Sequence, residues 1–142
     1  MRAFIRHPSD IPIEIFSEQR VAHATQRLTN VSIGGLCYRS DTFFEIGLLV
    51  RVRISLIKPP FEAKSRVVWC LKRDTGFDVG LQFIEIRDIY KVRLVEQICH
   101  IEHYKKKVFR EEGRVLSGEE AALEWLSKYD CEFPDLESPN LP

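Results

Sequence analysis

Two arginines and a short polar turn are the residues of this sequence best suited to binding chemistry. Arg2 and Arg6 are spaced as R-x-x-x-R at the start of the sequence. Residues 30–35 read Asn-Val-Ser-Ile-Gly-Gly, an N-x-S-x-x-G pattern that offers an amide, a hydroxyl and a glycine turn. A guanidinium binds phosphate oxygens or a guanine edge through two parallel N–H groups. Together the two motifs predict a site that holds a planar base edge and a phosphate at once.

Each motif also has a plainer interpretation. Two arginines on a terminal segment are solvated side chains when nothing else accompanies them. Asn30 and Ser32 can bond their own backbone in a turn, an arrangement that is compatible with ligand binding. Glycine permits positive φ and a close approach of backbone to ligand. Because both motifs occur together, we favour the binding interpretation.

Between residues 11 and 83 the sequence shows the two-residue alternation of half-buried strands. The predicted strands cover residues 11–15, 48–56, 61–71 and 77–83. Turn signals occur at residues 34–35, 58–60 and 73–76. The pattern predicts a mainly β fold, a small antiparallel barrel of about six strands whose closure removes exposed edges. The alternation in residues 61–71 places Trp69 in the core.

After residue 85 the period becomes helical, with neither glycine nor proline from residue 86 to about 110. The predicted buried stripe is made of apolar residues at helical spacing: Ile89, Val92, Leu94 or Val95, Ile98, Ile101, Tyr104 and Val108. At ~1.5 Å per residue this helix is longer than a barrel is wide. Residues 102–110 therefore project past the core or pack on something else.

A second, short helix is predicted over residues 118–129. Gly113 ends the long helix, and Ser117 with Glu120 forms a capping-box signature before the short one. Trp125 is expected to dock against the long helix, the alternative being that it faces a partner. Residues 1–112 are expected to form the barrel with its arm and long helix, and residues 113–142 an extension of the same domain.

Composition narrows the function classes. The 142 residues, 44% of them apolar, suit one domain. Lysine plus arginine (21) equals aspartate plus glutamate (21), which argues against a bulk binder of DNA or RNA. No apolar run approaches the ~20 residues of a membrane span, and no signal-peptide pattern opens the sequence. We expect a cytoplasmic protein without membrane insertion.

Catalytic and metal-binding patterns are weak. The sequence has no G-x-S-x-G elbow, phosphate loop or H-E-x-x-H, so no catalytic residue is predicted and no enzyme is expected. The cysteines, Cys37, Cys70, Cys99 and Cys131, include no C-x-x-C pair and are expected to be reduced. Cys99 and His103 share a helical face, but two ligands do not make a site, so no metal is predicted.

The sequence resembles the PilZ domain family, the bacterial receptor module for cyclic di-GMP, over roughly its first two thirds. The resemblance rests on Arg2 and Arg6, on residues 11–15 as a first strand, and on Asn30, Ser32 and Gly35. It continues through residues 67–69 and 77–83, where the family shows a tryptophan strand and a G-x-x-F strand.

The resemblance implies a role for each motif residue. Arg2 and Arg6 match the arginines that stack on guanine and contact its edges and the phosphate. Asn30 and Ser32 match the strand residues that bond a guanine, and Gly35, with Gly34 beside it, matches the turn. A second set, on the G-x-x-F strand, either lines the floor of the site or is structural: Asp78, Gly80 and Gln82.

The implied function is reception of cyclic di-GMP, with the change relayed to an unidentified effector protein. No cofactor beyond this ligand is expected, and the protein is expected to be a monomer or weak dimer.

We expect the arm, residues 1–10, to be mobile when empty and to fold over the ligand. The family's extra arginine beside the first motif arginine is replaced here by Met1 and Ala3, so one ligand or an intercalated pair is possible. The alternative is a nucleotide-independent scaffold for type IV pilus or motility proteins.

Overall fold

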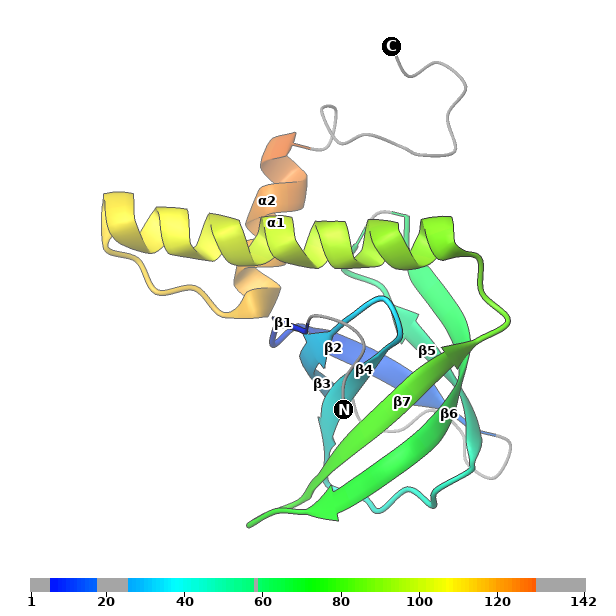
Figure 1. The fold of residues 1–142 in the computed structure, drawn as a ribbon. Helices are drawn as coiled ribbons and strands as arrows, with labels where there is room; N and C mark the ends of the chain where they lie inside the picture. The colour runs from blue at the N-terminus through cyan, green and yellow to red at the C-terminus, as the bar shows by residue number, and fades with distance from the viewer. Residues whose placement is uncertain (1–5, 18–25, 58, 130–142) are drawn as a thin grey trace.

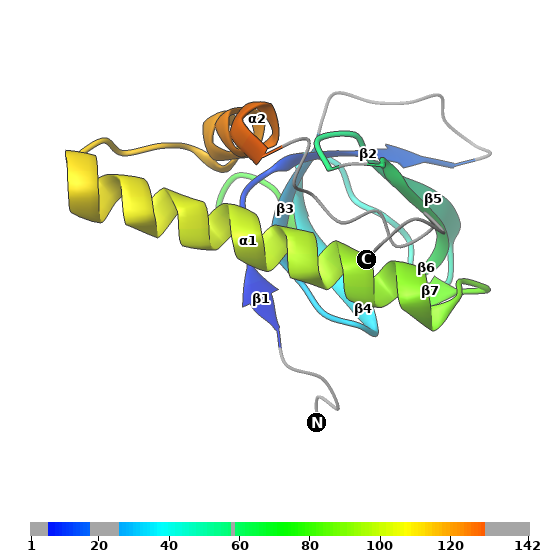
Figure 2. The same cartoon turned by 90° about the horizontal axis from the view of Figure 1, so that it is seen from above.

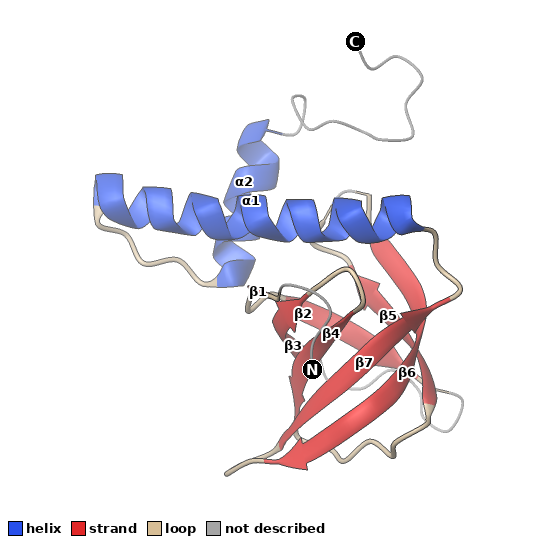
Figure 3. Ribbon diagram, viewed as in Figure 1, coloured by secondary structure: helices blue, strands red, loops and turns tan. Residues whose placement is uncertain are grey.

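The protein is a closed antiparallel β-barrel with two helices at one end (Figures 1 and 3). The computed structural model describes residues 6–17, 26–57 and 59–129. The strands are β1 (His7–Pro8), β2 (Pro12–Phe16), β3 (Gln26–Val31), β4 (Gly35–Ser40), β5 (Leu49–Ile54), β6 (Phe61–Lys72) and β7 (Phe77–Ile84). They pair in the order β3-β2-β5-β6-β7-β4, and the β3–β4 pairing closes the six-stranded barrel. β1 adds an extra short strand to β3, so the predicted fold class is confirmed.

The two-residue alternation of the sequence decides which strand residues enter the core. In β5, Val50, Val52 and Ile54 are buried, whereas Arg51 and Arg53 are exposed. Burying one face of each strand against the opposite wall removes apolar surface from water, which is the main favourable contribution to folding. The outer arginines meet carboxylates of the neighbouring strands at 3.7–3.9 Å. Such exposed pairs contribute little to stability.

The alternation fails in β6, and this changes which side chains reach the outer surface. In β6 the register with β7 shifts between Val67 and Trp69, which marks a β-bulge. Val67 is buried in the core, but the Trp69 side chain lies outside the barrel against Gly80 of β7. The prediction that Trp69 belongs to the core is therefore wrong. A bulge adds one residue to a strand, so every side chain after it changes face.

The long helix α1 (Asp88–Glu112) lies across one end of the barrel and extends beyond it (Figure 1). Leu94, Ile98 and Ile101 are buried in the same core as the barrel interior. The helix ends at Gly113, whose φ of 72° is left-handed and whose N–H donates to the Phe109 carbonyl oxygen, a helix-ending geometry that glycine favours. Within the part of the chain that the structure describes, neither helix is both long and apolar enough to cross a bilayer.

The buried stripe of α1 differs from the predicted one at its N-terminal end. Ile89 and Val92 are 43% and 45% exposed, whereas Arg93 and Gln97 are buried. Only the side of the first turns of α1 that faces the barrel rim is buried. The connection from β7 sets which side of the helix that is. Periodicity gives the spacing of a stripe but not the direction in which the helix lies on its support.

The second helix α2 (Gly118–Tyr129) packs against the half of α1 that extends beyond the barrel. Trp125 stacks on His100 of α1 with ring centroids 5.4 Å apart, which confirms its intramolecular docking. Tyr104 donates to a Glu124 oxygen at 2.9 Å, and Arg114 donates to both oxygens of Glu124. These hydrogen bonds, that from Arg114 first, lower the pKa of Glu124. A carboxyl with a lowered pKa stabilises the fold above its unfolded pKa, so this contribution is lost as the pH falls through the folded value.

The predicted capping box is present at the start of α2, and its removal is expected to be measurable. The Glu120 N–H donates to Ser117 Oγ at 3.1 Å, and the Ser117 N–H donates to Glu120 Oε1 at 2.9 Å. Ser117→Ala is expected to lower the free energy of unfolding by about 1 kcal/mol in urea denaturation. Ser127→Ala, an exposed change within the same helix, is the control. Equal stability of the two variants would contradict a role for the cap.

Candidate functional site

The candidate site lies on the outer face of the barrel, where three strands bring motif residues into register. Asn30 of β3 pairs with Cys37 of β4, and Cys37 pairs with Gly80 of β7. A bulge between Leu28 and Asn30 shifts the register of β3, and Leu28 is buried in the core, whereas Asn30 is only half-buried. The site therefore depends on a local irregularity of the strand, as functional residues on sheets often do.

Arg6 is held over this face by the short strand β1. His7 pairs with Val31 and Pro8 with Asn30, so the residue before them is delivered to the motif strand. Arg6 Nη1 donates to Asn30 Oδ1 at 2.9 Å and lies 3.2 Å from Cys37 Sγ. Arg6 Nε is buried and has no hydrogen-bond partner among the described residues. A buried donor left open is costly, and ligands commonly satisfy such groups.

The Ser32 hydroxyl is used inside the turn that joins β3 to β4. It accepts from the Gly34 N–H at 3.2 Å and lies 3.4 Å from the Gly35 carbonyl oxygen. The Ser32 N–H also donates to that carbonyl, at 2.8 Å, and Ser32 is only 3% exposed. The Ser32 side chain thus bonds the backbone of its own turn, whereas the Asn30 side chain bonds Arg6. The result is a hydrogen-bonded turn in which the Ile33 side chain is exposed.

Close packing explains why the turn ends on glycine. A Cβ on Gly35 would overlap the Leu81 carbonyl oxygen of β7. Gly34 is tied to the same strand, because its carbonyl oxygen accepts from the Phe83 N–H at 3.0 Å. The turn is thereby fixed against β7, and the side chains that flank it have defined positions.

The three floor candidates share the outer face of β7 but differ in their surroundings. Asp78 is engaged by Arg39 at 3.3 Å and by Arg73 at 2.6 Å. Gly80 is covered by Trp69, and Gln82 is exposed. Asp78 is thus an ion-pair partner in this structure, while Gly80 and Gln82 flank the Arg6–Asn30 contact through their register with β4. Sequence reasoning missed that Trp69 lies on this face, because only the bulge puts it there.

The structure brings together Arg6, Asn30 and the 32–35 turn. Arg2 lies outside the described residues, so its position is not addressed. Of the arm, residues 6–10 are described, and they pack on β3: the Ser9 N–H donates to the Thr29 carbonyl oxygen at 3.0 Å. That the arm is mobile when empty and folds over the ligand stays a prediction.

The arm also touches α1, a contact that no local sequence pattern signals. His7 Nδ1 lies 3.4 Å from Cys99 Sγ, between residues 92 positions apart. Asp10 Oδ1 lies 3.4 Å from Lys105 Nζ and packs on Gly118 at the start of α2. Burial raises the pKa of the Cys99 thiol, and two nearby glutamates raise it further. The arm is therefore in contact with the barrel on one side and with the helices on the other.

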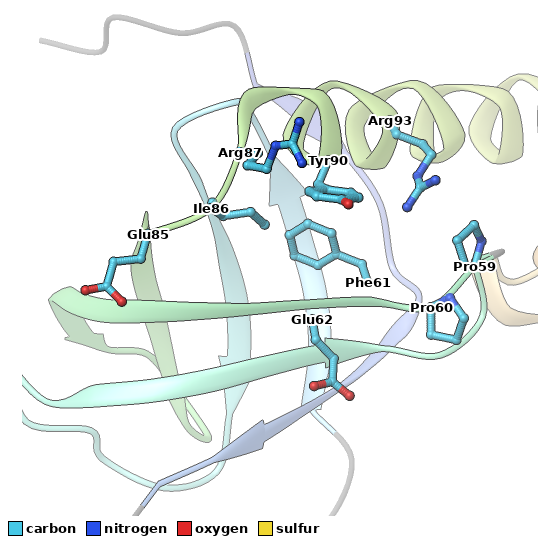
Figure 4. A pocket seen from close by; sticks show the side chains of 9 residues that line it. All are labelled: Pro59, Pro60, Phe61, Glu62, Glu85, Ile86, Arg87, Tyr90 and Arg93. Atoms are coloured by element: carbon cyan, nitrogen blue, oxygen red, sulfur yellow. The ribbon is translucent and has the colours of Figure 1, made fainter. Parts of the chain in front are cut away.

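A pocket of about 540 Å³ lies at the N-terminal end of α1 (Figure 4). Arg87 and Arg93 lie 5.9 and 5.3 Å from the centre of the Tyr90 ring. Two carboxylates also line it, Glu62 and Glu85, which pair with cations of the barrel strands. No motif residue of the described part lines this pocket, so it is separate from the candidate site.

Other chemistries find less support in the described residues. No disulfide bond joins Cys37, Cys70 and Cys99 to one another. No group of three or more potential metal ligands is arranged around a common point among the residues with described positions. What the site offers is hydrogen-bond donors and a cation above the outer face of β3 and β4. That arrangement suits a planar, anionic ligand.

A closed six-stranded barrel with an arginine arm over its outer face defines a class of domain, and comparison with known families agrees. The PilZ domain family model matches residues 1–100. The chain belongs to the PilZ domain family. No curated protein matches the chain.

Three solved structures illustrate the fold that the chain shares with known proteins. The PilZ domain of YcgR from Escherichia coli, solved with c-di-GMP, has a TM-score of 0.59 and 14% identity, over 80% of this chain and 98% of that one. The PilZ domain of CeSA from a cellulose-synthesizing bacterium has a TM-score of 0.52 and 18% identity, over 70% and 99%. The Bacillus subtilis inhibitor of motility MotI (DgrA) has a TM-score of 0.58 and 19% identity, over 73% of this chain and 52% of that one. The chain thus spans about half the length of MotI.

Proposed function

We propose that this protein is a cyclic di-GMP receptor that passes its ligand state to an effector protein. The observation that carries the proposal is the contact between Arg6 Nη1 and Asn30 Oδ1, 2.9 Å, which joins the two motifs on one surface. Membership of the PilZ family and a structural neighbour solved with c-di-GMP support the choice of ligand.

The proposed ligand fits the chemistry of the site. Cyclic di-GMP carries two phosphates and two guanines. The Arg6 guanidinium has five N–H donors, and one of those on Nη1 donates to Asn30. The remaining donors, Nε among them, are assigned to phosphate or to a guanine edge. The Asn30 amide nitrogen is assigned to a guanine acceptor. Each charge-assisted bond contributes roughly 1.5–3 kcal/mol, so a few contacts reach the ~8 kcal/mol of micromolar binding.

The Arg6–Asn30 hydrogen bond supports a shared role for the two residues in binding, because it holds the guanidinium beside the motif strand. Arg2 is proposed as the second arginine of the site, with Ser32, Gly34 and Gly35 shaping the turn and Gly80 and Gln82 the floor. Asp78 is proposed to position Arg39 and Arg73 rather than to meet the ligand, because both cations already engage it.

The relay is proposed to run through the arm. His7 contacts Cys99 of α1, and Asp10 contacts Lys105. A ligand that shifts the arm therefore changes these contacts with α1. The helices and the residues that follow them are the surfaces we assign to the effector protein.

Calorimetric titration with cyclic di-GMP tests the proposal. We expect binding at micromolar concentration or tighter, and a loss of about tenfold for Asn30→Ala, because one charge-neutral hydrogen-bonding group and the anchor of Arg6 are removed. Thr29→Ala, the adjacent exposed change on β3, is the matched control. Absence of binding heat in the unmodified protein would reject the receptor and favour the nucleotide-independent scaffold.

A further inference from the structure

A hollow of about 560 Å³ lies between the turn that carries the motif and α1. Ile33, the residue between Ser32 and Gly34, forms one wall, and Val92, Val95 and Cys99 of α1 form the other. Ile33 is 39% exposed and Val92 45% exposed, so two large apolar side chains from distant parts of the chain face the same open space. Exposed apolar surface concentrated in a concave site is typical of ligand pockets.

The arm and the motif turn connect this pocket with the candidate site. His7 follows Arg6 in the chain, and its ring touches Cys99, one of the pocket residues, at 3.4 Å. The views in Figures 1 and 2 agree that β1 and the β3–β4 turn lie beside α1. The residue that follows Arg6 thus touches a residue of the pocket wall, which places the pocket near a ligand bound to Arg6.

Glu96 is the residue of this pocket whose side chain is suited to distinguish guanine from adenine. Glu96 supplies an exposed carboxylate at the edge of the apolar walls. A carboxylate accepts two hydrogen bonds side by side, and guanine presents two adjacent donors, N1–H and the N2 amino group. Adenine presents an acceptor, N1, at the corresponding position, which repels a carboxylate. Apolar walls with a carboxylate at one edge thus match guanine and reject adenine.

We propose that the pocket between Ile33 and α1 receives a guanine base, and that Glu96 reads its N1–H and N2 amino edge. This inference rests on the proposed function and extends it. Cyclic di-GMP has two guanines: the motif residues engage one, and the α1 pocket takes the other. Glu96 is then a specificity-determining residue, and α1 becomes part of the ligand site itself.

The rim of the pocket contains a natural reporter. His100 lines the pocket and stacks on Trp125, with the rings 12° from parallel. A base that enters the pocket changes the surroundings of this pair. Cys99 is half-buried in the pocket wall, so an occupant also shields its thiol from alkylating reagents.

Affinities for cyclic di-GMP and cyclic di-AMP, measured for three proteins, test the proposal. The unmodified protein is expected to prefer cyclic di-GMP by at least a hundredfold, because a site built around hydrogen bonds rejects an analogue that cannot make them. Glu96→Gln is expected to weaken cyclic di-GMP binding at least tenfold and to reduce that preference. Glu111→Gln, an exposed change on the same helix away from the pocket, is expected to bind as the unmodified protein does. Unchanged affinity and preference in Glu96→Gln would overturn the inference.

A second measurement does not depend on any substitution. Iodoacetamide labelling, followed at each cysteine by mass spectrometry, is expected to slow at least fivefold at Cys99 when cyclic di-GMP is added, with no change at Cys70 of β6. Labelling of Cys99 that is unaffected by saturating ligand would contradict occupancy of the pocket.

The binding measurements distinguish failure of this inference from failure of the proposed function. Binding that depends on Arg6 but not on Glu96 would agree with the proposed receptor function and reject only this inference, whereas no binding at all would reject both.

Discussion

Replacing Arg6 with alanine is expected to weaken cyclic di-GMP binding by about thirtyfold or more, or at least ~2 kcal/mol. Arg6 is the described residue that joins the arm to the motif strand, through its 2.9 Å hydrogen bond to Asn30. The substitution removes a cation and five N–H donors from the ligand face and leaves Asn30 without its partner. Calorimetric titration gives the change in affinity directly.

Two further variants show whether the guanidinium itself is needed. Arg6→Lys keeps the charge but not the planar fork, and is expected to recover only part of the affinity. Arg51→Ala, an exposed arginine on the outside of β5, is expected to bind normally. Arg6 is only half-buried, so thermal unfolding of Arg6→Ala should occur within a few degrees of the unmodified protein. Full affinity in Arg6→Ala would place the ligand elsewhere.

The largest expected effect on stability is that of Gly35→Ala. The added Cβ overlaps the Leu81 carbonyl oxygen and lies 3.0–3.1 Å from the Leu81 carbonyl carbon and the Gln82 Cα. All three are backbone atoms of β7, and they cannot retreat without separating β4 from β7, a pairing that runs from Gly35 to Ser40. We expect a loss of about 3 kcal/mol or more in the free energy of unfolding, measured by urea denaturation.

Gly113→Ala is the matched control for this prediction. Gly113 has a φ of 72°, and a Cβ there meets nothing within 4 Å. Its substitution therefore measures backbone strain alone, about 1 kcal/mol. If Gly35→Ala costs no more than Gly113→Ala, then steric overlap with β7 does not explain the motif glycine. A large difference assigns Gly35 to the architecture of the turn rather than to direct contact with ligand.

Most of the fold could be predicted because its signals are local. The alternation of β5 and the helical spacing of α1 follow from residues a few positions apart, and the Ser117–Glu120 cap is read within four residues. What failed depends on partners far away in the chain. The position of Trp69 depends on a bulge against β7, and a bulge is a property of a pair of strands rather than of one.

Sequence reasoning named the residues of the candidate site but not their geometry, and their role in binding stays a prediction. Arg6 and Asn30 were expected to face one ligand, and the structure adds that they bond each other. The contact of His7 with Cys99 and the exposure of Val92 on α1 had no sequence signal, because both depend on how the helix lies across the barrel. These two features are the ones that make α1 a candidate wall of the site.

Nuclear magnetic resonance of the Arg6 Nε–H tests the central claim most directly. This group is buried and has no hydrogen-bond partner in the described structure, so a phosphate or guanine acceptor should change its resonance strongly. On titration with cyclic di-GMP we predict a large shift of Arg6 Nε–H, accompanied by shifts of the Asn30 side-chain amide and the Gly34 and Gly35 backbone N–H groups. Saturation with ligand that leaves these signals in place while the Arg87 and Arg93 signals move would contradict the account and locate binding in the pocket at the start of α1.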